Sequence, residues 1–283
     1  MINFDTKFEA FVKKWYRKNA AKYAPEQMEE RINEIYDEWA ETPDAELGTS
    51  PLEYFRGIKG AAELIKTLRD YHEEGLPYPN LLLDRIVEER ACEKFLVKML
   101  DEEEGDEHGH DGYGCGCDCC GGGNLRTLAI NLLAEKDSRA GYKRYIEWLF
   151  DSRADMHLRE LAAETLSQDA EYVKEEILKR VPSEDCFADD LAAYILVNCP
   201  GDKRVTRFLT ELFLSGEDGQ LYADYLGRYG DADAIPHLYD AAETCDYITY
   251  IEIINALEAL GETPLIKRDF SSDPNYKKVR GDR

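Results

Sequence analysis

Apolar residues recur at three- and four-residue steps along most of this chain, the spacing that places them on one face of an α-helix. The first such stripe occupies residues 4–23, and a second follows Pro25. Ser50, Pro51 and Glu53 then match a capping box, so a further helix is predicted to start there. The pattern predicts a succession of amphipathic helices from the first residues onward.

Glycine and asparagine punctuate the next part of the pattern. Gly57 or Gly60 is predicted to break the helix that follows Ser50, and Gly75 is predicted to end it, because glycine readily leaves a helix. Asn80 is predicted to cap a segment that reaches about residue 101, built as two short helices that meet near Glu89, and Asn124 is predicted to cap a later helix.

A second, longer periodicity runs through the second half of the chain. Four leucines mark it at steps of 33, 30 and 30 residues, each followed five positions later by another leucine: Leu128, Leu161, Leu191 and Leu221. Internal repeats of this length are typical of helical solenoids, in which each unit buries its apolar face against its neighbours. We therefore predict an all-α fold of stacked helix pairs.

The turns inside these pairs repeat as well. Glycine followed by an acidic residue occurs at Gly201, Gly230 and Gly261, where glycine can adopt the left-handed conformation that closes a helix. The acidic residue that follows favours the positive N-terminal end of the next helix. The predicted organisation is an N-terminal helical region at residues 1–79, a solenoid at 80–266 with an insertion at 102–123, and a mobile basic tail at 267–283.

One stretch of the repeat carries a family resemblance. Residues 221–238 read LYADYLGRYGDADAIPHL and resemble HEAT-like repeats of the type first named for phycobilisome lyases. The resemblance covers about residues 125–266 and implies an armadillo-type α-α superhelix. Members of this superfamily mostly bind other macromolecules through a groove, so the resemblance implies a non-enzymatic protein-binding scaffold whose partner is another protein or a peptide.

Two enzymatic branches of the same superfamily fit this sequence poorly. Deoxyhypusine hydroxylase, which resembles these repeats in fold, holds its metals with several His-Glu dipeptides, whereas this chain has only His72-Glu73. HEAT-like DNA glycosylases clamp DNA in a basic groove, and an acidic chain repels phosphate backbones. Enzymatic activity is therefore disfavoured, and no catalytic residues are assigned.

The charge, the apolar runs and the cysteines of the chain limit the predicted partners and the predicted cellular location. The chain has 59 acidic and 35 basic residues and a formal net charge of −24, which argues against nucleic acid and anionic membrane surfaces. Its longest apolar run, residues 191–197, is far shorter than the roughly 20 residues that span a bilayer. Crowded cysteines and a start that lacks a signal-like apolar stretch favour a reducing compartment, so we predict a cytoplasmic protein.

The insertion carries the one concentration of metal-ligand chemistry in the sequence. Imidazoles and thiolates at short spacing, with flexible glycines between them, are the ligand types that zinc prefers: His108, His110, Cys115, Cys117, Cys119 and Cys120. Two interpretations stay open. The insertion is either a zinc site, which makes a metal-binding protein or metal-dependent enzyme the alternative function, or a disordered low-complexity segment with reduced cysteines.

Aromatic residues on the second helix of two pairs are candidate anchors for a bound peptide. Trp148 and Tyr172 are predicted to project away from the packed stripe and to line a groove, where aromatic anchors supply much of a binding energy. Most of the other tyrosines coincide with the packing stripe and are predicted to lie in the core.

Overall fold

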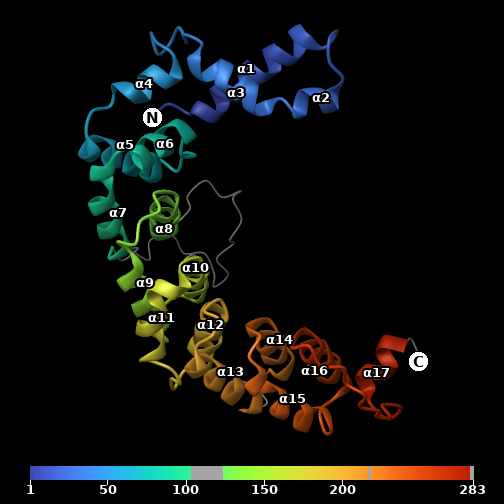
Figure 1. The fold of residues 1–283 in the computed structure, drawn as a ribbon. Coiled ribbons are helices and arrows are strands. Elements are labelled where there is room, and N and C mark those ends of the chain that lie inside the picture. Colours follow the sequence, from blue (N-terminus) through green and yellow to red (C-terminus); the bar gives the residue numbers. More distant parts are fainter. Residues whose placement is uncertain (103–123, 216–217, 281–283) are drawn as a thin grey trace. The chain divides into compact units, whose positions relative to one another are not determined.

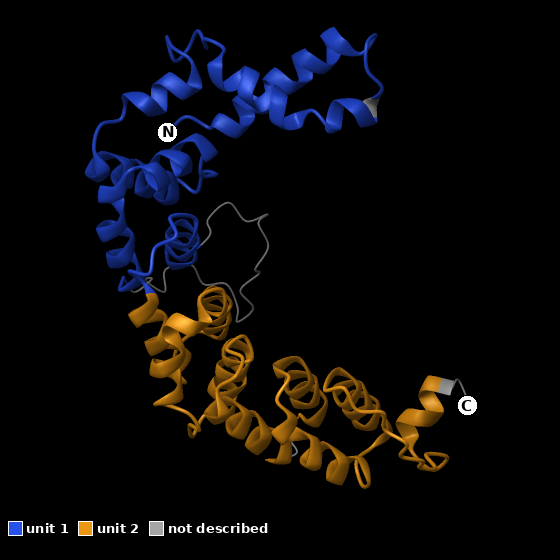
Figure 2. Ribbon diagram, viewed as in Figure 1, with its two compact units in different colours: residues 1–141 blue, residues 142–283 orange. Residues whose placement is uncertain are grey.

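The computed structural model describes residues 1–102, 124–215 and 218–280 of the 283-residue chain. In these residues every regular element is helical, apart from one isolated β-bridge between Asp44 and Thr49. The all-α prediction is confirmed for this part of the chain. The helices divide between two compact units, residues 1–141 and 142–283, which are described separately (Figure 2).

Unit 1 begins with helices that differ from the prediction in one respect. The second apolar stripe forms two helices rather than one, because the chain leaves helical geometry at Arg31, with φ −99° and ψ 11°. The helices of unit 1 within its described residues are α1 (Phe4–Asn19), α2 (Pro25–Glu29), α3 (Ile32–Glu41), α4 (Pro51–Gly57), α5 (Ala61–Glu73), α6 (Asn80–Glu88), the 3₁₀ turn η1 (Arg90–Cys92), α7 (Glu93–Leu100) and α8 (Leu125–Glu135) (Figure 1).

Aromatic side chains build the core of the first half of unit 1. Phe4 is 2% exposed, and its ring centroid lies 4.8 Å from that of Phe55 and 6.4 Å from that of Trp39. The hydroxyl of Tyr71 donates to the carbonyl of Ile2 at 2.9 Å. These contacts tie α1 to α3 and α4, and Ile2, just before α1, to α5. Large aromatic rings suit this role because each buries a large apolar area.

The predicted helix ends of unit 1 are largely confirmed. The Ser50 hydroxyl accepts from the Glu53 amide at 3.3 Å, and Gly60 has φ +85° between α4 and α5. Asn124 caps α8 by accepting from two first-turn amides. Asn80 is different: it is the first residue of α6, and the N-cap position belongs to Pro79.

Lys136 joins the end of α8 to the end of α6. Its ammonium donates to the carbonyls of Ile86 at 3.1 Å, Val87 at 2.5 Å and Glu89 at 3.1 Å. A cation is favourable there because the last carbonyls of a helix lack partners inside the helix and carry partial negative charge.

Unit 2 consists of two rows of helices, which Figure 1 shows side by side. The odd row contains α9 (Tyr142–Leu149), α11 (Ala170–Leu178), α13 (Lys203–Ser215) and α15 (Ile235–Ala242). The even row contains α10 (Met156–Ser167), α12 (Cys186–Leu196), α14 (Gly219–Tyr229) and α16 (Tyr247–Ala259). Within the unit, α10 packs on α9 and α12, α14 packs on α13 and α16, and α16 packs on α15. The 3₁₀ turn η2 (Ala232–Ala234) leads into α15, and α17 (Pro274–Arg280) follows the rows.

The sequence repeat returns as a repeat of burial. Leu161, Leu191 and Leu221 are each half-buried, the next two residues are buried, the third is exposed, and the fourth and fifth are buried again. Residues from Leu128 in unit 1 follow the same succession, and those from Glu252 depart from it only at Ile254, which is half-buried. Residues at equivalent positions of the sequence repeat are therefore buried to a similar degree, as expected of equivalent repeats.

Glycines close the turns of unit 2 as predicted and also allow one close helix contact. Gly201, Gly230 and Gly261 have φ of +87°, +80° and +87°. Gly227 has another role: a Cβ atom there would lie 2.8 Å from the Cα of Ala256. The backbones of α14 and α16 therefore approach each other more closely than any side chain at position 227 would allow.

The C-terminal segment packs against unit 2 over residues 262–280, in contrast to the expected mobile tail. Residues 262–270 alternate between less and more exposed positions, ending at Phe270, which is 8% exposed. The Phe270 ring lies 4.8 Å from that of Tyr250, whose hydroxyl donates to the carbonyl of Ile266 at 2.8 Å. Arg268 donates to the carbonyl of Ala242 at 2.8 Å. No helix forms directly after Pro264, and α17 begins at Pro274.

Candidate functional site

The solvent-facing side of the even row is the candidate functional site. Its side chains come from the repeat leucine, the residue before it and the third residue after it, because these positions share one face of a helix. We call this surface the even-row face. It comprises Glu160, Leu161 and Glu164 of α10, Asp190, Leu191 and Tyr194 of α12, Gln220, Leu221 and Asp224 of α14, and Ile251, Glu252 and Asn255 of α16.

Apolar side chains on this face stay in contact with solvent. Tyr194 is 38% exposed and Ile251 is 37% exposed, and the repeat leucines Leu161, Leu191 and Leu221 are half-buried. A helix surrounded by the core on all sides would bury these positions completely. Here the two residues that follow each repeat leucine are buried, but the leucine itself is only half-buried. The face therefore offers apolar contact area at regular intervals along the row.

A hydrogen bond fixes the carboxylate of Asp190 on this face. The Tyr222 hydroxyl donates to Asp190 across the boundary between α12 and α14. Tyr222 is 2% exposed, and its burial, together with this hydrogen bond, raises the pKa of the phenol. The phenol therefore stays protonated at neutral pH and remains a donor, which holds the Asp190 side chain at the edge of the helix.

Next to this bond lies a small aromatic and charged group on α14. The Arg228 guanidinium lies 5.7 Å from the Tyr225 ring centroid and 3.6 Å from a carboxylate oxygen of Asp224. Burial raises the pKa of Tyr225, and the positive charge of Arg228 opposes that effect. Arg228 is the only exposed Lys or Arg within the four even-row helices, and Asp224 already neutralises part of its charge.

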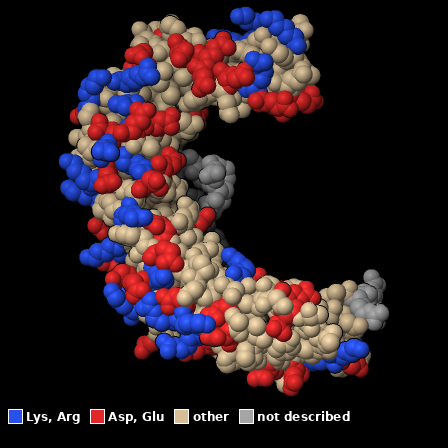
Figure 3. Space-filling view, in the orientation of Figure 1, with Lys and Arg blue, Asp and Glu red and all other residues tan. Residues whose placement is uncertain are grey.

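The glutamates of the even-row face differ in their pairing from those of α11 in the odd row. In the described part of the chain, Glu160, Glu164 and Glu252 form no ion pair. In α11, Glu175 contacts Arg204 at 2.5 Å, and each of the other two glutamates is paired with the lysine three positions later in the chain. Within unit 2, Figure 3 shows a group of Lys and Arg side chains around α11 and α13. The even-row face therefore carries negative charge that the protein itself does not neutralise.

The two aromatic anchors predicted from the sequence lie in the odd row, not on this face. Trp148 is 5% exposed and stacks on Tyr145 with ring centroids 5.8 Å apart, so the prediction that it projects from the packed stripe is wrong. Its ring is needed to cover the core beside Tyr145. Tyr172 is 58% exposed and its ring lies 5.9 Å from that of Tyr142, so it does project, and its role as an anchor stays a prediction.

The predicted zinc ligands cannot be placed, because His108, His110 and the four cysteines from Cys115 to Cys120 lie outside the described residues. Among residues 1–102, 124–215 and 218–280, no three His, Cys, Asp or Glu side chains converge as a metal site requires. Cys92 and Cys199 are fully buried, and burial raises the pKa of each thiol to about 11.

Comparisons with models of protein families, with curated proteins and with solved structures found no match to this chain. Across the described residues, no helix combines the length and the apolar character that crossing a bilayer requires.

Sequence reasoning located the repeat leucines but missed the face that they belong to. The signal was present: an acidic residue directly precedes Leu161 and Leu191, and another stands three positions after Leu161 and Leu221. Which carboxylates lack a cation could not be seen, because the partner of Glu175 lies 29 residues away in the chain.

Proposed function

We propose that this protein is a non-enzymatic scaffold that binds a basic, partly apolar segment of another protein on the even-row face. For the architecture we propose a HEAT-like solenoid. The recurring burial pattern after Leu161, Leu191 and Leu221 and the left-handed glycines between helices support that assignment.

The observation that carries the proposal is the combination of unpaired carboxylates and exposed apolar side chains on one face. Apolar groups supply most of the free energy when they leave water, and complementary charges set orientation and exclude wrong partners. Glu160 and Glu164 flank the half-buried Leu161 within one turn of α10. A partner whose Lys or Arg residues are interleaved with aliphatic or aromatic residues would satisfy both features together.

A basic partner also loses little by binding here. Where a carboxylate already has a cation, a new cation must displace it, and the net gain is small. Glu160, Glu164 and Glu252 have no such cation among the described residues, so contact with a partner's Lys or Arg adds attraction without breaking an existing pair. The even-row face is therefore favoured over the surface of α11, where every glutamate already has a cation.

The experiment is a selection of random peptides against the full chain, followed by affinity measurement on the selected peptides. We expect enrichment of sequences that combine Lys or Arg with Leu, Ile or aromatic residues, with affinity falling as salt is raised. The double variant Glu160→Lys/Glu164→Lys should weaken binding roughly tenfold or more. The matched control Glu171→Lys/Glu176→Lys makes the same change of charge on α11 and should leave binding nearly intact.

Two results would contradict the proposal. Selected peptides that are acidic or uncharged would show that the unpaired carboxylates do not recognise the partner. Equal loss of affinity in both double variants would show that only the overall charge of the protein matters.

The alternative function is a metal-binding protein or metal-dependent enzyme centred on residues 108–120, and it stays a prediction from the sequence. It requires about one zinc ion for each chain in protein purified without a histidine tag. It also requires that Cys117→Ser lowers the zinc content. Protein that contains no metal and takes up no added zinc would rule this function out.

A further inference from the structure

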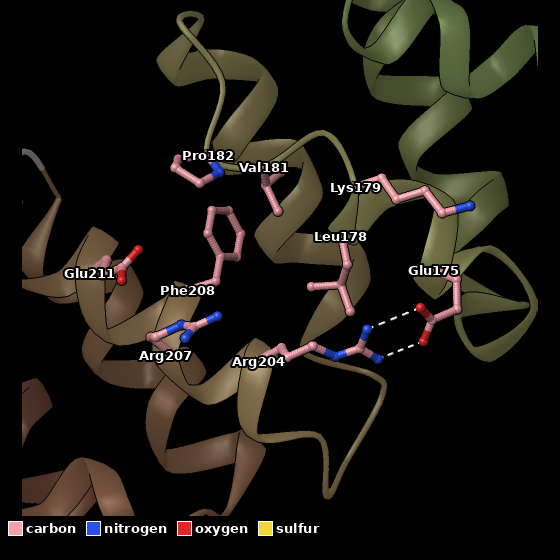
Figure 4. A pocket seen from close by; sticks show the side chains of 9 residues that line it. All are labelled: Glu175, Leu178, Lys179, Val181, Pro182, Arg204, Arg207, Phe208 and Glu211. Atoms are coloured by element: carbon pink, nitrogen blue, oxygen red, sulfur yellow. Dashed lines mark hydrogen bonds and ion pairs between the residues drawn. The ribbon is translucent and has the colours of Figure 1, made fainter.

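A small cavity lies on the odd row, away from the residues of the even-row face. It has a volume of about 130 Å³ and lies between the end of α11, the loop that follows it and α13 (Figure 4). Four apolar side chains form its walls: Leu178, Val181, Pro182 and Phe208. Such walls favour an apolar group of a ligand over water.

Two guanidinium groups lie at this cavity, and the first of them is already occupied. Arg204 donates to both carboxylate oxygens of Glu175, at 3.0 Å and 2.5 Å, and to Asp202 at 2.6 Å. This fork-to-fork geometry uses the donors of Arg204 on the protein's own acids, so Arg204 shapes the wall without attracting a further anion.

Arg207 is different, because within the described residues it forms no hydrogen bond and no ion pair. Figure 4 shows its guanidinium beneath the Phe208 ring, on the side of Arg204. Phe208 is 4% exposed, so its ring is part of the packed wall rather than a mobile cover. A planar guanidinium with unused donors beside an apolar wall matches a ligand that carries an anion on a short apolar body.

We propose that this cavity binds the carboxylate of a small apolar monoanion, with Arg207 as the counter-ion. A free short-chain aliphatic acid and the C-terminal residue of a peptide share this chemistry. Both present a planar carboxylate that a guanidinium can bind through two parallel hydrogen bonds. Both also have an aliphatic group that a cavity of about 130 Å³ can take up.

The apolar walls of the cavity favour an apolar acid over inorganic phosphate. Glu211 also lines the cavity and has no cation within the described residues, so its negative charge opposes the binding of any anion that gains nothing from the walls. A phosphate group has no apolar body to fill the cavity, whereas a carboxylic acid with an aliphatic group does. The site is therefore expected to select a monocarboxylate.

The test measures binding to the full chain by calorimetry or by chemical-shift changes. The probes are 3-methylbutanoate, N-acetyl-glycyl-leucine, the amide of that peptide and inorganic phosphate. We expect at least one carboxylate to bind at millimolar concentration, and the amide and phosphate to bind roughly tenfold more weakly or not at all. Binding of 3-methylbutanoate would identify a free acid as a sufficient ligand. Binding of the peptide acid alone would identify a peptide C-terminus.

Variants separate Arg207 from the general charge of the surface. Arg207→Gln should weaken carboxylate binding roughly tenfold or more, and Arg207→Lys should lie between Gln and the natural residue, because it keeps the charge but loses the fork. The control is Lys143→Gln, which removes one positive charge from α9, where the side chain is 90% exposed.

Three results would overturn the proposal. They are the failure of both carboxylates to bind, equal binding of the amide or phosphate, and unchanged binding by Arg207→Gln. Because none of these residues belongs to the even-row face, the outcome is independent of the peptide selection described above.

Discussion

The two rows of unit 2 use the same kinds of residue for different purposes. In the odd row, Glu175 is bound by Arg204, which stands one repeat later in the chain, and Lys203 contacts Asp231 of the following turn at 2.7 Å. In the even row, the carboxylates of Glu160 and Glu164 have no such partner within the described residues. These charges of α11 and α13 join neighbouring repeats, whereas the carboxylates of Glu160 and Glu164 remain available to other molecules.

The even row is joined instead by contacts that do not use its exposed carboxylates. Arg159 of α10 is 5% exposed and donates both to the carbonyl of Leu149 at 2.9 Å and to Asp185, the N-cap residue of α12, at 2.6 Å. Gly227 lets α14 and α16 approach closely. The difference teaches that buried contacts can hold a row of helices together while the carboxylates on its solvent-facing side stay free to bind another molecule.

The largest expected effect comes from breaking the buried link of the even row. Arg159→Met removes the cation from Asp185 and a donor from Leu149, and loss of one partner of a buried pair costs about 3 kcal/mol of unfolding free energy. Denaturant unfolding of the two proteins measures this change. The control Arg153→Met removes an ion pair with Asp151 whose arginine side chain is 89% exposed, and it should change stability little. Equal effects of the two substitutions would contradict the assignment.

The next largest effect should come from separating α14 and α16. Gly227→Leu places a side chain where a Cβ atom alone would lie 2.8 Å from the Cα of Ala256, and overpacking of this kind costs about 2 kcal/mol. Thermal unfolding provides the measurement. Gly57→Ala is the control, because a Cβ atom at position 57 meets nothing within 4 Å. A stable Gly227→Leu protein would show that the even row does not need this close approach.

A smaller effect concerns the pairing of the odd row at low pH. The hydrogen bond from Arg204 lowers the pKa of Asp202 from 3.8 to about 2, against the opposing effect of burial. A lowered pKa in the folded state means that the ionised carboxylate stabilises the fold above about pH 4, and that this contribution is lost as pH falls toward 2. The stability difference between the natural protein and Asp202→Asn should therefore shrink over this interval. A difference that stays constant from pH 5 to about pH 2 would contradict the pairing.

The smallest effect concerns cysteines that the two units bury. Cys92 in unit 1 and Cys199 in unit 2 are fully buried, and burial raises the pKa of both thiols to about 11. Only the thiolate reacts quickly, so alkylation at pH 8 should be slow at both positions and much faster at the exposed Cys186. Mass spectrometry of the peptides measures each site separately. Rapid alkylation of Cys199 would show that the contact between successive repeats of unit 2 opens readily.

Local signals in the sequence predicted the helix ends better than they predicted the contacts between helices. Ser50, Asn124 and Gly230 act within a few residues of their own position, so the chain pattern alone identified them. The close approach at Gly227 depends on Ala256, and no periodicity distinguishes that glycine from one that ends a helix. Such long-range partners must be seen in three dimensions.

At the candidate site, too, local patterns were predictable from the sequence and long-range contacts were not. The repeat leucines were visible because their period is regular, but the burial of Trp148 depends on Tyr145 and on helices beyond its own. The tail from residue 267 was predicted to be mobile from its charged composition. A prediction from overall composition overlooks the contribution of one residue, Phe270, whose ring contacts the rings of Tyr247 and Tyr250.

The packing of Phe270 has a practical consequence for anyone who shortens this protein. A chain that stopped at residue 266 would lose Phe270, Tyr276 and the hydrogen bond from Arg268 to Ala242, and would leave the rings of Tyr247 and Tyr250 without their cover. Exposed aromatic surface at the end of a helical array invites a second molecule to occupy it. We expect such a truncated form to dimerise or precipitate at concentrations where the 283-residue chain stays dispersed, which light scattering would detect.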